Sequence, residues 1–163
     1  MTGSRPPDPA EGNAVYRFFY RNWKPTRLGR WVNRFAGWYS GLGLPPRIQA
    51  ALEVRGRRSG RTRSNPVVIP TVGGHRYLVS MLGPQSDWVK NVEAADGEAV
   101  IRRGRRERVR LVGVPPGERA PVLCEYVRIA PGGRQHFPLP VGAPLADFKK
   151  IADHYPVFRI DPR

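Results

Sequence analysis

The sequence has little of the chemistry that builds disulfide frameworks or metal clusters. Among 163 residues there is one cysteine, Cys124, and only three histidines, His75, His136 and His154. A single cysteine cannot form an internal disulfide, and the histidines lie too far apart in sequence to predict a metal site. The composition therefore predicts a protein of a reducing, cytoplasmic compartment that binds no metal.

Long apolar runs and acidic residues are also scarce. No stretch approaches the roughly 18 apolar residues that a membrane-spanning helix requires, so any membrane contact is expected to be peripheral. Residues 1–14 are polar, rich in proline and glycine, and predicted to form a disordered tail. Only 13 acidic residues oppose 28 lysines and arginines, and the formal charge of +15 predicts an anionic partner: nucleic acid, an acidic membrane surface or a polyanionic ligand.

Two familiar nucleotide-binding motifs are missing. No G-x-G-x-x-G follows an expected strand, and the basic stretch 56–63 lacks the Lys-Ser/Thr ending of a Walker loop. Rossmann-type dinucleotide binding and nucleoside triphosphate chemistry are therefore disfavoured.

Residues 15–46 hold more than half of the aromatic side chains, interleaved with arginine and lysine. Trp31, Phe35, Trp38 and Tyr39 fall at i, i+4, i+7 and i+8, which places them on one face of an amphipathic helix. A basic aromatic helix of this kind is typical of a membrane-interface anchor, here over residues 15–39, but the stripe would equally suit packing on the protein's own core. Both interpretations stay open.

Beyond residue 46 the pattern changes to the two-residue period of β-strands. Strands are expected over 51–56, 64–72, 75–82, 98–103, 106–114 and 156–160. Helices are expected over 88–95, with Asp87 as N-cap, and over 115–130 and 144–155. Antiparallel hairpins with few helices predict an α+β fold: a split or closed β-barrel over residues 47–163, with helices packed outside.

Two stretches could bind a ligand. The first, GRRSGRTR over residues 56–63, would join two strands, and its glycines and four arginines suit a phosphate or carboxylate, although a solvated basic hairpin is the commoner alternative. The second is SMLGPQSDWVKN over 80–91. There a strand end, a Gly-Pro turn and a helix N-terminus would hold a planar ring against Trp88, unless that tryptophan simply belongs to the core.

Three stretches carry a family resemblance: LEVRGRRSGRTRSNPVVI, GHRYLVSMLGPQSDWVKNVEAADGEAVIRRGRRERVRLVGV and YPVFRI. They resemble the deazaflavin-dependent nitroreductase family, the coenzyme F420-dependent oxidoreductases of actinobacteria. The resemblance implies a split β-barrel of the FMN-binding-like kind. It also implies the cofactor F420, an 8-hydroxy-5-deazaflavin with a polyanionic phosphate and oligoglutamate tail that the arginine stretch would neutralise.

The resemblance also implies site residues. The phosphate and tail would be held by Arg57, Arg58, Ser59, Gly60 and Arg63. Asn65 and Pro66 would line the path to the ring, and the ring would be cradled by Ser80, Met81, Leu82, Gly83, Trp88, Val89 and Asn91. Tyr126 and Ser80 are the candidate catalytic residues, as proton donors, with Tyr155 or a bound water as alternatives. Well-known members of the family have a lysine and paired glycines where this chain has Met81, Leu82 and Gly83.

The predicted function is hydride transfer from reduced F420 to a hydrophobic, electrophilic small molecule such as a quinone, an enone or a nitroaromatic. No nucleic-acid partner is expected in that case, and the protein would lie in the cytoplasm or at the inner face of the plasma membrane. Two alternatives stay open. One is a basic barrel that binds single-stranded nucleic acid, and the other is a split-barrel enzyme that uses FMN, whose single phosphate needs fewer arginines.

Overall fold

The computed structural model describes residues 20–21, 24–25 and 49–163. Two short strands, β1 (Tyr20–Arg21) and β2 (Lys24–Pro25), pair antiparallel. The backbone is therefore extended at these four residues, which fall in the segment expected to be helical. The predicted tail and the aromatic stripe from Trp31 to Tyr39 lie outside the described residues. Within the described ranges, no helix has both the length and the apolar character needed to cross a bilayer.

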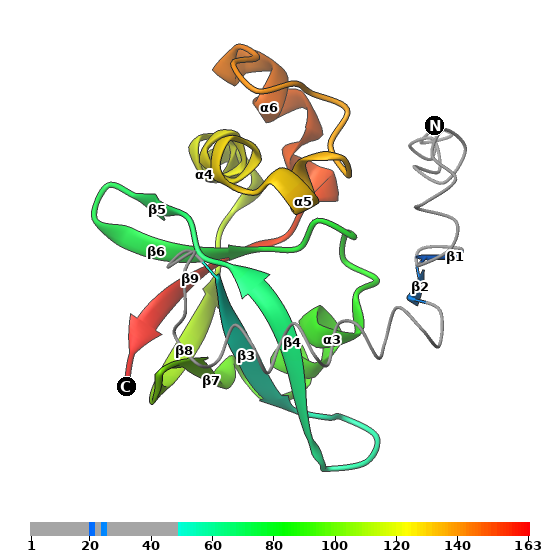
Figure 1. Cartoon of the computed structure of the whole chain (residues 1–163), viewed down its shortest axis with the longest axis vertical. Helices are drawn as coiled ribbons and strands as arrows, with labels where there is room; N and C mark the ends of the chain where they lie inside the picture. Colours follow the sequence, from blue (N-terminus) through cyan, green and yellow to red (C-terminus); the bar gives the residue numbers. More distant parts are fainter. Residues whose placement is uncertain (1–19, 22–23, 26–48) are drawn as a thin grey trace.

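Seven strands form one antiparallel sheet in the order β4-β3-β7-β8-β9-β6-β5. The strands are β3 (Gln49–Arg55), β4 (Thr62–Val68), β5 (Thr71–Val72), β6 (His75–Val79), β7 (Glu98–Arg103), β8 (Arg105–Gly113) and β9 (Val157–Pro162). The sheet curls into a half-barrel, and the helices lie outside it or at its end (Figure 1). This architecture confirms the predicted α+β split barrel.

The stretch 64–72, expected to be one strand, is divided into β4 and β5 at Ile69 and Pro70. The carbonyl of Pro70 accepts a 3.0 Å bond from the Tyr77 amide of β6, which turns the chain into the next hairpin. Pro66 lies within β4, the first strand in the sheet order and therefore an edge. Proline is tolerated at an edge because its missing N–H breaks no ladder bond on the open side.

The helices follow the predicted order with three differences. The helical elements are α3 (Asp87–Ala94), α4 (Pro116–Ile129), α5 (Pro131–Arg134), α6 (Leu145–Ile151) and the 3-10 turn η2 (Ala152–His154). The N-cap of α3 is Ser86, so the prediction of Asp87 was wrong by one residue. The stretch 144–155 divides into α6 and η2, and the short α5 forms in a segment expected to be irregular.

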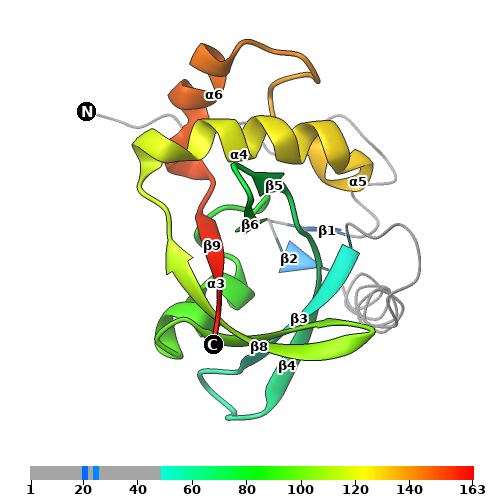
Figure 2. The ribbon, with the colours of Figure 1, turned by 90° about the vertical axis from the view of Figure 1, so that its left-hand side faces the viewer.

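Two apolar cores hold these elements together. The barrel core lies inside the curled sheet, where the inward-facing side chains of the strands pack against α3. Its fully buried members include Leu52, Leu78, Val89, Val92 and Val109. The helical-layer core lies between the β5–β6 end of the sheet and α4, α5 and α6, and includes Leu123, Val127, Phe148 and Val157. Figure 2 shows α4 across the end of the sheet with α6 on its far side.

Candidate functional site

The loop between β3 and β4 is a closed turn. The Gly60 amide donates to the Gly56 carbonyl at 2.8 Å, and the Gly56 amide donates to the Arg61 carbonyl at 2.9 Å. Gly60 has a φ of 65°, in the left-handed region that favours glycine. A Cβ on Gly56 would lie 3.1 Å from the Arg61 carbonyl oxygen and 3.2 Å from Ser59 Oγ. The two glycines therefore allow the arginines to be carried on a tight turn.

Arg57 fastens this turn to α3. Its backbone amide and its Nη1 donate to Asn91 Oδ1 at 3.2 and 2.8 Å, and its Nη2 bonds Asp87 Oδ1 at 3.0 Å. The Arg57 side chain is only 23% exposed, and Asn91 is 5% exposed. The structure thus brings together two residues predicted to bind the cofactor, Arg57 and Asn91, but their polar groups are hydrogen-bonded to each other.

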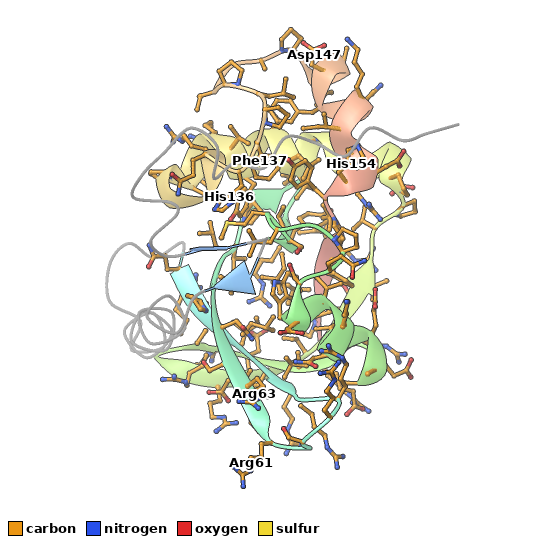
Figure 3. All side chains as sticks on the ribbon, turned by 90° about the vertical axis from the view of Figure 1, so that its right-hand side faces the viewer. Arg61, Arg63, His136, Phe137, Asp147 and His154 are labelled. Atoms are coloured by element: carbon orange, nitrogen blue, oxygen red, sulfur yellow. The ribbon has the colours of Figure 1, made fainter. Side chains whose placement is uncertain are left out.

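The other arginines of the loop are arranged differently. Arg58, Arg61 and Arg63 are exposed, and none of them forms an ion pair within the described part of the chain. Figure 3 places Arg61 and Arg63 at the end of the molecule remote from the helical layer that carries His136 and His154. This end of the barrel therefore presents positive charge that no carboxylate of residues 49–163 neutralises.

Asn65 continues this surface along β4. In the β3–β4 register Arg63 lies opposite Val54 and Asn65 opposite Leu52, so both side chains leave β4 on the face that β3 turns toward the barrel core. The Nδ2 of Asn65 is buried and has no hydrogen-bond partner in the described part of the chain. A buried amide donor without an acceptor is costly, and it suits a polar ligand group placed beside it. Pro66, predicted with it, lies on the opposite face against Ala51.

The predicted ring-binding segment is a tight turn between β6 and α3. Ser80 is 1% exposed, and its Oγ donates to the Gly83 carbonyl at 2.8 Å. A second 2.8 Å bond joins Ser80 Oγ to Ser86 Oγ. Gly83 has a φ of 77°, and a Cβ there would lie 3.3 Å from the His154 carbonyl oxygen. The turn is thus built on two buried hydroxyls, with Met81, Leu82 and Gly83 half-buried beside it.

Tyr126 reaches this turn from α4. Its hydroxyl donates to Met81 Sδ at 3.5 Å. The ring lies 5.6 Å from that of Phe137, and a Cβ on Gly133 would come within 2.5 Å of the Tyr126 hydroxyl oxygen. Tyr126 is 4% exposed, so it is held by packing on every side. The structure therefore brings both predicted catalytic hydroxyls, those of Tyr126 and Ser80, to the same turn, although each is buried and already bonded.

The remaining predicted ring contacts face the core. Val89 is fully buried in the barrel core. Trp88 packs its ring on Phe158, with centroids 5.6 Å apart and the planes inclined by 59°. Tyr155, the alternative proton donor, donates to the His136 carbonyl at 2.8 Å, and burial raises the pKa of its phenol to about 12.

A cleft of about 1100 Å³, which the sequence did not predict, lies beside the arginine loop. It is lined by Glu53, Val54, Arg55, Gly56, Arg57, Gly60, Thr62, Ala94, Ala95, Glu98, Ala99, Val100, Arg106, Arg108, Val109 and Arg163. Glu53, only 11% exposed, is bonded there to Arg102 Nε at 2.9 Å and Arg106 Nη2 at 2.7 Å. The run RRGRRERVR signalled this basic surface, but it was interpreted only as a hairpin.

The family model described as F420H(2)-dependent quinone reductase matches residues 27–135. The chain belongs to this family. The match confirms the predicted enzyme class, an F420-dependent oxidoreductase. It does not confirm the expected membership of the deazaflavin-dependent nitroreductase family, because the matched family has a different name. No curated protein is similar enough in sequence to match the chain.

A solved structure supports the fold. The chain resembles a protein of unknown function, Atu2129 of Agrobacterium tumefaciens strain C58, with a TM-score of 0.53, 15% identity, and coverage of 85% of this chain and 55% of that one. It also resembles an F420-H2 dependent reductase, FDR-A, with a TM-score of 0.48, 18% identity, and coverage of 71% of this chain and 95% of that one. At 15% identity the likeness to Atu2129 concerns the fold alone.

Proposed function

We propose that this chain binds reduced coenzyme F420 at the β3–β4 loop and uses it to reduce a quinone. The observation that carries the proposal is the set of three exposed arginines, Arg58, Arg61 and Arg63, without a carboxylate partner in the described residues, next to the orphaned amide of Asn65. The proposed acceptor follows the name of the matched family, F420H(2)-dependent quinone reductase.

The donors present suit the chemistry of that cofactor. Guanidinium groups form charge-assisted, forked hydrogen bonds with phosphate and carboxylate oxygens. Arg58, Arg61 and Arg63 would hold the phosphate and oligoglutamate tail, while Asn65 Nδ2 would donate to a polar acceptor nearer the ring. Arg57 would act by bracing the loop on Asn91 and Asp87, because its own donors are used there.

The bound reduced deazaflavin would supply a hydride, and conversion of a quinone to a hydroquinone needs that hydride and one proton. The chain's contribution is mainly positioning. The hydroxyl pair of Ser80 and Ser86 holds the turn that would face the ring, and Met81 and Leu82 would give it an apolar wall suited to a hydrophobic substrate. Since Ser80 and Tyr126 are buried and bonded, we propose that water delivers the proton. Their catalytic assignment stays a prediction.

The first experiment is a titration of the full chain with F420 and, separately, with FMN, followed by tryptophan fluorescence at two salt concentrations. The double variant Arg58→Ala/Arg63→Ala should bind F420 at least about tenfold more weakly, because each lost charge-assisted bond contributes roughly 1.5–3 kcal/mol. The matched control Arg128→Ala/Lys149→Ala removes two charges from the helical layer and should bind normally. Equal weakening in both double variants would contradict the proposed site.

A second experiment measures oxidation of the reduced cofactor with a menaquinone analogue, an enone and a nitroaromatic. We expect turnover to be fastest with the quinone. Binding of F420 without turnover of any acceptor would contradict the reductase function while leaving the binding site intact. Tight FMN binding would favour the alternative of an FMN-dependent enzyme. A colourless protein that binds only single-stranded nucleic acid would favour the alternative of a nucleic-acid-binding barrel.

A further inference from the structure

Ten consecutive apolar residues connect α5 to α6. Residues 137–146 read FPLPVGAPLA, and no side chain among them carries a charge or can form a hydrogen bond. Exposed apolar runs are avoided on the surface of a globular domain unless they contact something. The exposure of this connection therefore decides whether it is part of the core or part of an interaction surface.

Most of the connection lies on the surface. Phe137 is buried and Leu139 half-buried in the helical-layer core, which anchors the start of the run. Among the described residues, three large apolar side chains are exposed, and two of them are Val141 at 48% and Leu145 at 44%. The third is Val112 on β8, at 37%. Exposed apolar side chains of this size are thus concentrated in one connection.

The connection is a protruding turn rather than a groove. Gly142 has a φ of 85°, and a Cβ there would meet no atom within 4 Å apart from its chain neighbours. In Figure 1 the stretch between α5 and α6 extends outward beside the helices, at the end of the molecule opposite the β3–β4 loop. Residues 138–146 therefore form an apolar tip that another surface can receive.

The backbone of the apolar tip also suits an apolar medium. An amide N–H without an acceptor is costly away from water, and three of the nine residues, Pro138, Pro140 and Pro144, have no N–H. The Ala143 amide donates to the Pro140 carbonyl at 3.3 Å, and the Asp147 amide donates to the Pro144 carbonyl at 3.0 Å. Few donors of the tip would therefore lose water without a partner.

Cations flank the apolar tip on both sides in sequence. Arg134 precedes it and Lys149 and Lys150 follow it, whereas Asp147 is the only carboxylate among residues 131–152. Asp147 bonds Lys150 Nζ at 2.7 Å. Three cations against one carboxylate leave an excess of two positive charges beside the apolar side chains. This combination suits the interface of an anionic bilayer, where lysine and arginine meet the headgroups and apolar side chains reach the acyl boundary.

We propose that the apolar tip inserts into the headgroup region of an anionic lipid bilayer, with Val141 and Leu145 deepest. A protein partner suits the tip less well, because protein interfaces carry roughly one hydrogen bond per 100–200 Å² and these side chains form none. The contact is distinct from the one predicted for residues 15–39. It goes beyond the proposed function, since it needs neither cofactor nor quinone.

The position of the tip is compatible with the proposed function. Figure 3 places Asp147, which follows the tip, at the opposite end of the molecule from Arg61. The polyanionic tail of a cofactor held by the arginine loop would therefore lie away from an anionic membrane. The tip would hold the chain at the phase in which a hydrophobic quinone dissolves.

The test is co-sedimentation of the full chain, without cofactor, with vesicles of phosphatidylcholine and phosphatidylglycerol. The double variant Val141→Ser/Leu145→Ser should bind at least about tenfold more weakly, because two side chains lose apolar area that the bilayer would bury. Val112→Ser makes the same kind of change on β8 and should bind like the parent chain. Equal binding of the parent and the double variant, or equal weakening by Val112→Ser, would overturn the proposal.

A gain of affinity tests the same contact without removing apolar area. Tryptophan prefers the membrane interface, so Val141→Trp should bind the vesicles severalfold more tightly than the parent chain. Unchanged or weaker binding of this variant would contradict insertion of the tip. Urea denaturation should give the same unfolding free energy for the double variant and the parent, since both side chains are exposed, and this separates lost binding from lost folding.

The flanking charge and the other occupants have their own outcomes. Lys149→Ala should weaken binding to the anionic vesicles about fivefold, as expected for one lysine near the surface, and should leave binding to pure phosphatidylcholine unchanged. A dimer that Val141→Ser/Leu145→Ser abolishes, with no vesicle binding by the parent, would show that a second copy covers the tip and would overturn the proposal. Because the F420 titration tests residues at the opposite end of the molecule, vesicle binding and cofactor binding can fail separately.

Discussion

The arginine-loop end of the barrel, with Arg61 and Arg63, lies apart from the helical layer, with His136 and His154 (Figure 3), and the two regions differ in how their polar groups are bonded. In the helical layer two tyrosine hydroxyls are turned inward and bonded: Tyr155 donates to the His136 carbonyl and Tyr126 to Met81 Sδ. One buried atom of this layer, Arg134 Nε, has no hydrogen-bond partner among the described residues. At the loop end Arg58, Arg61 and Arg63 lack ion-pair partners among the described residues. The difference indicates that one region contributes mainly to stability, while the other keeps charge available for a ligand.

The largest expected effect tests the helical layer. Phe148 is fully buried in its core, and Phe148→Ala should lower the free energy of unfolding by about 3–5 kcal/mol through lost burial and a cavity. Urea denaturation measures the change. Lys149→Ala, at the exposed neighbouring position, is the control and should change stability by less than about 0.5 kcal/mol. A small effect of Phe148→Ala would mean that the layer contributes little to folding.

A pH dependence should come from the same layer. Burial lowers the pKa of His136 from 6.5 to about 4, so the folded state binds fewer protons than the unfolded state between those values. Stability is then fully present above pH 6.5 and is lost as the pH falls toward 4, by an amount on the order of 3 kcal/mol. Unfolding measured from pH 7.5 to 4 should show this slope, and His136→Gln should flatten it. If the variant shows the same slope of unfolding free energy against pH, the acid sensitivity comes from a group other than His136.

At the loop end, neighbouring arginines should behave differently. Arg57→Ala removes the Nη1 donor to Asn91 Oδ1 and the Nη2 bond to Asp87. The backbone amide of residue 57 still donates to Asn91 Oδ1, on a residue that is 5% exposed. We expect a loss of about 1–2 kcal/mol of unfolding free energy. Arg58→Ala should leave stability within about 0.5 kcal/mol and weaken only cofactor binding. Equal stability losses in the two variants would remove the distinction between a bracing and a ligand-binding arginine.

The smallest expected effect is at the turn after β6, where Met81 contacts the helical layer. Tyr126→Phe removes one O–H···S bond and keeps the ring, so stability should fall by less than about 1 kcal/mol. If Tyr126 only positions Met81, kcat with a quinone should change less than about threefold, and its pH profile should keep its shape. A large fall in kcat with unchanged cofactor affinity would instead support the original assignment of Tyr126 as a proton donor.

Local patterns in the sequence predicted most elements of the fold. Strand alternation identified β3, β6, β7, β8 and β9, since one face of each meets a core. Gly73 and Gly74, both with positive φ, form the turn into β6. The N-cap of α3 was misplaced because Ser86 and Asp87 are adjacent and both residue types cap helices well.

The candidate site was predicted only in part. Arginine density and glycine spacing in residues 56–63 pointed to an anion, and that signal lies within eight consecutive residues. Which arginine braces and which remains available depends on contacts across the chain: Arg57 meets Asn91 at a separation of 34 residues, and Tyr126 meets Met81 at a separation of 45. No local pattern predicts such pairs.

The sequence by itself determined the strand and helix order, the tight turns and the excess of positive charge, because alternation, glycine and arginine act over a few neighbouring residues. Only the tertiary structure decided where that charge is neutralised. Curling of the sheet brings Glu53 to Arg102 and Arg106 and brings Arg76 to Glu107, and it leaves Arg58, Arg61 and Arg63 without an ion-pair partner among the described residues. Ion pairing depends on distances of a few ångströms, which are set when distant strands meet.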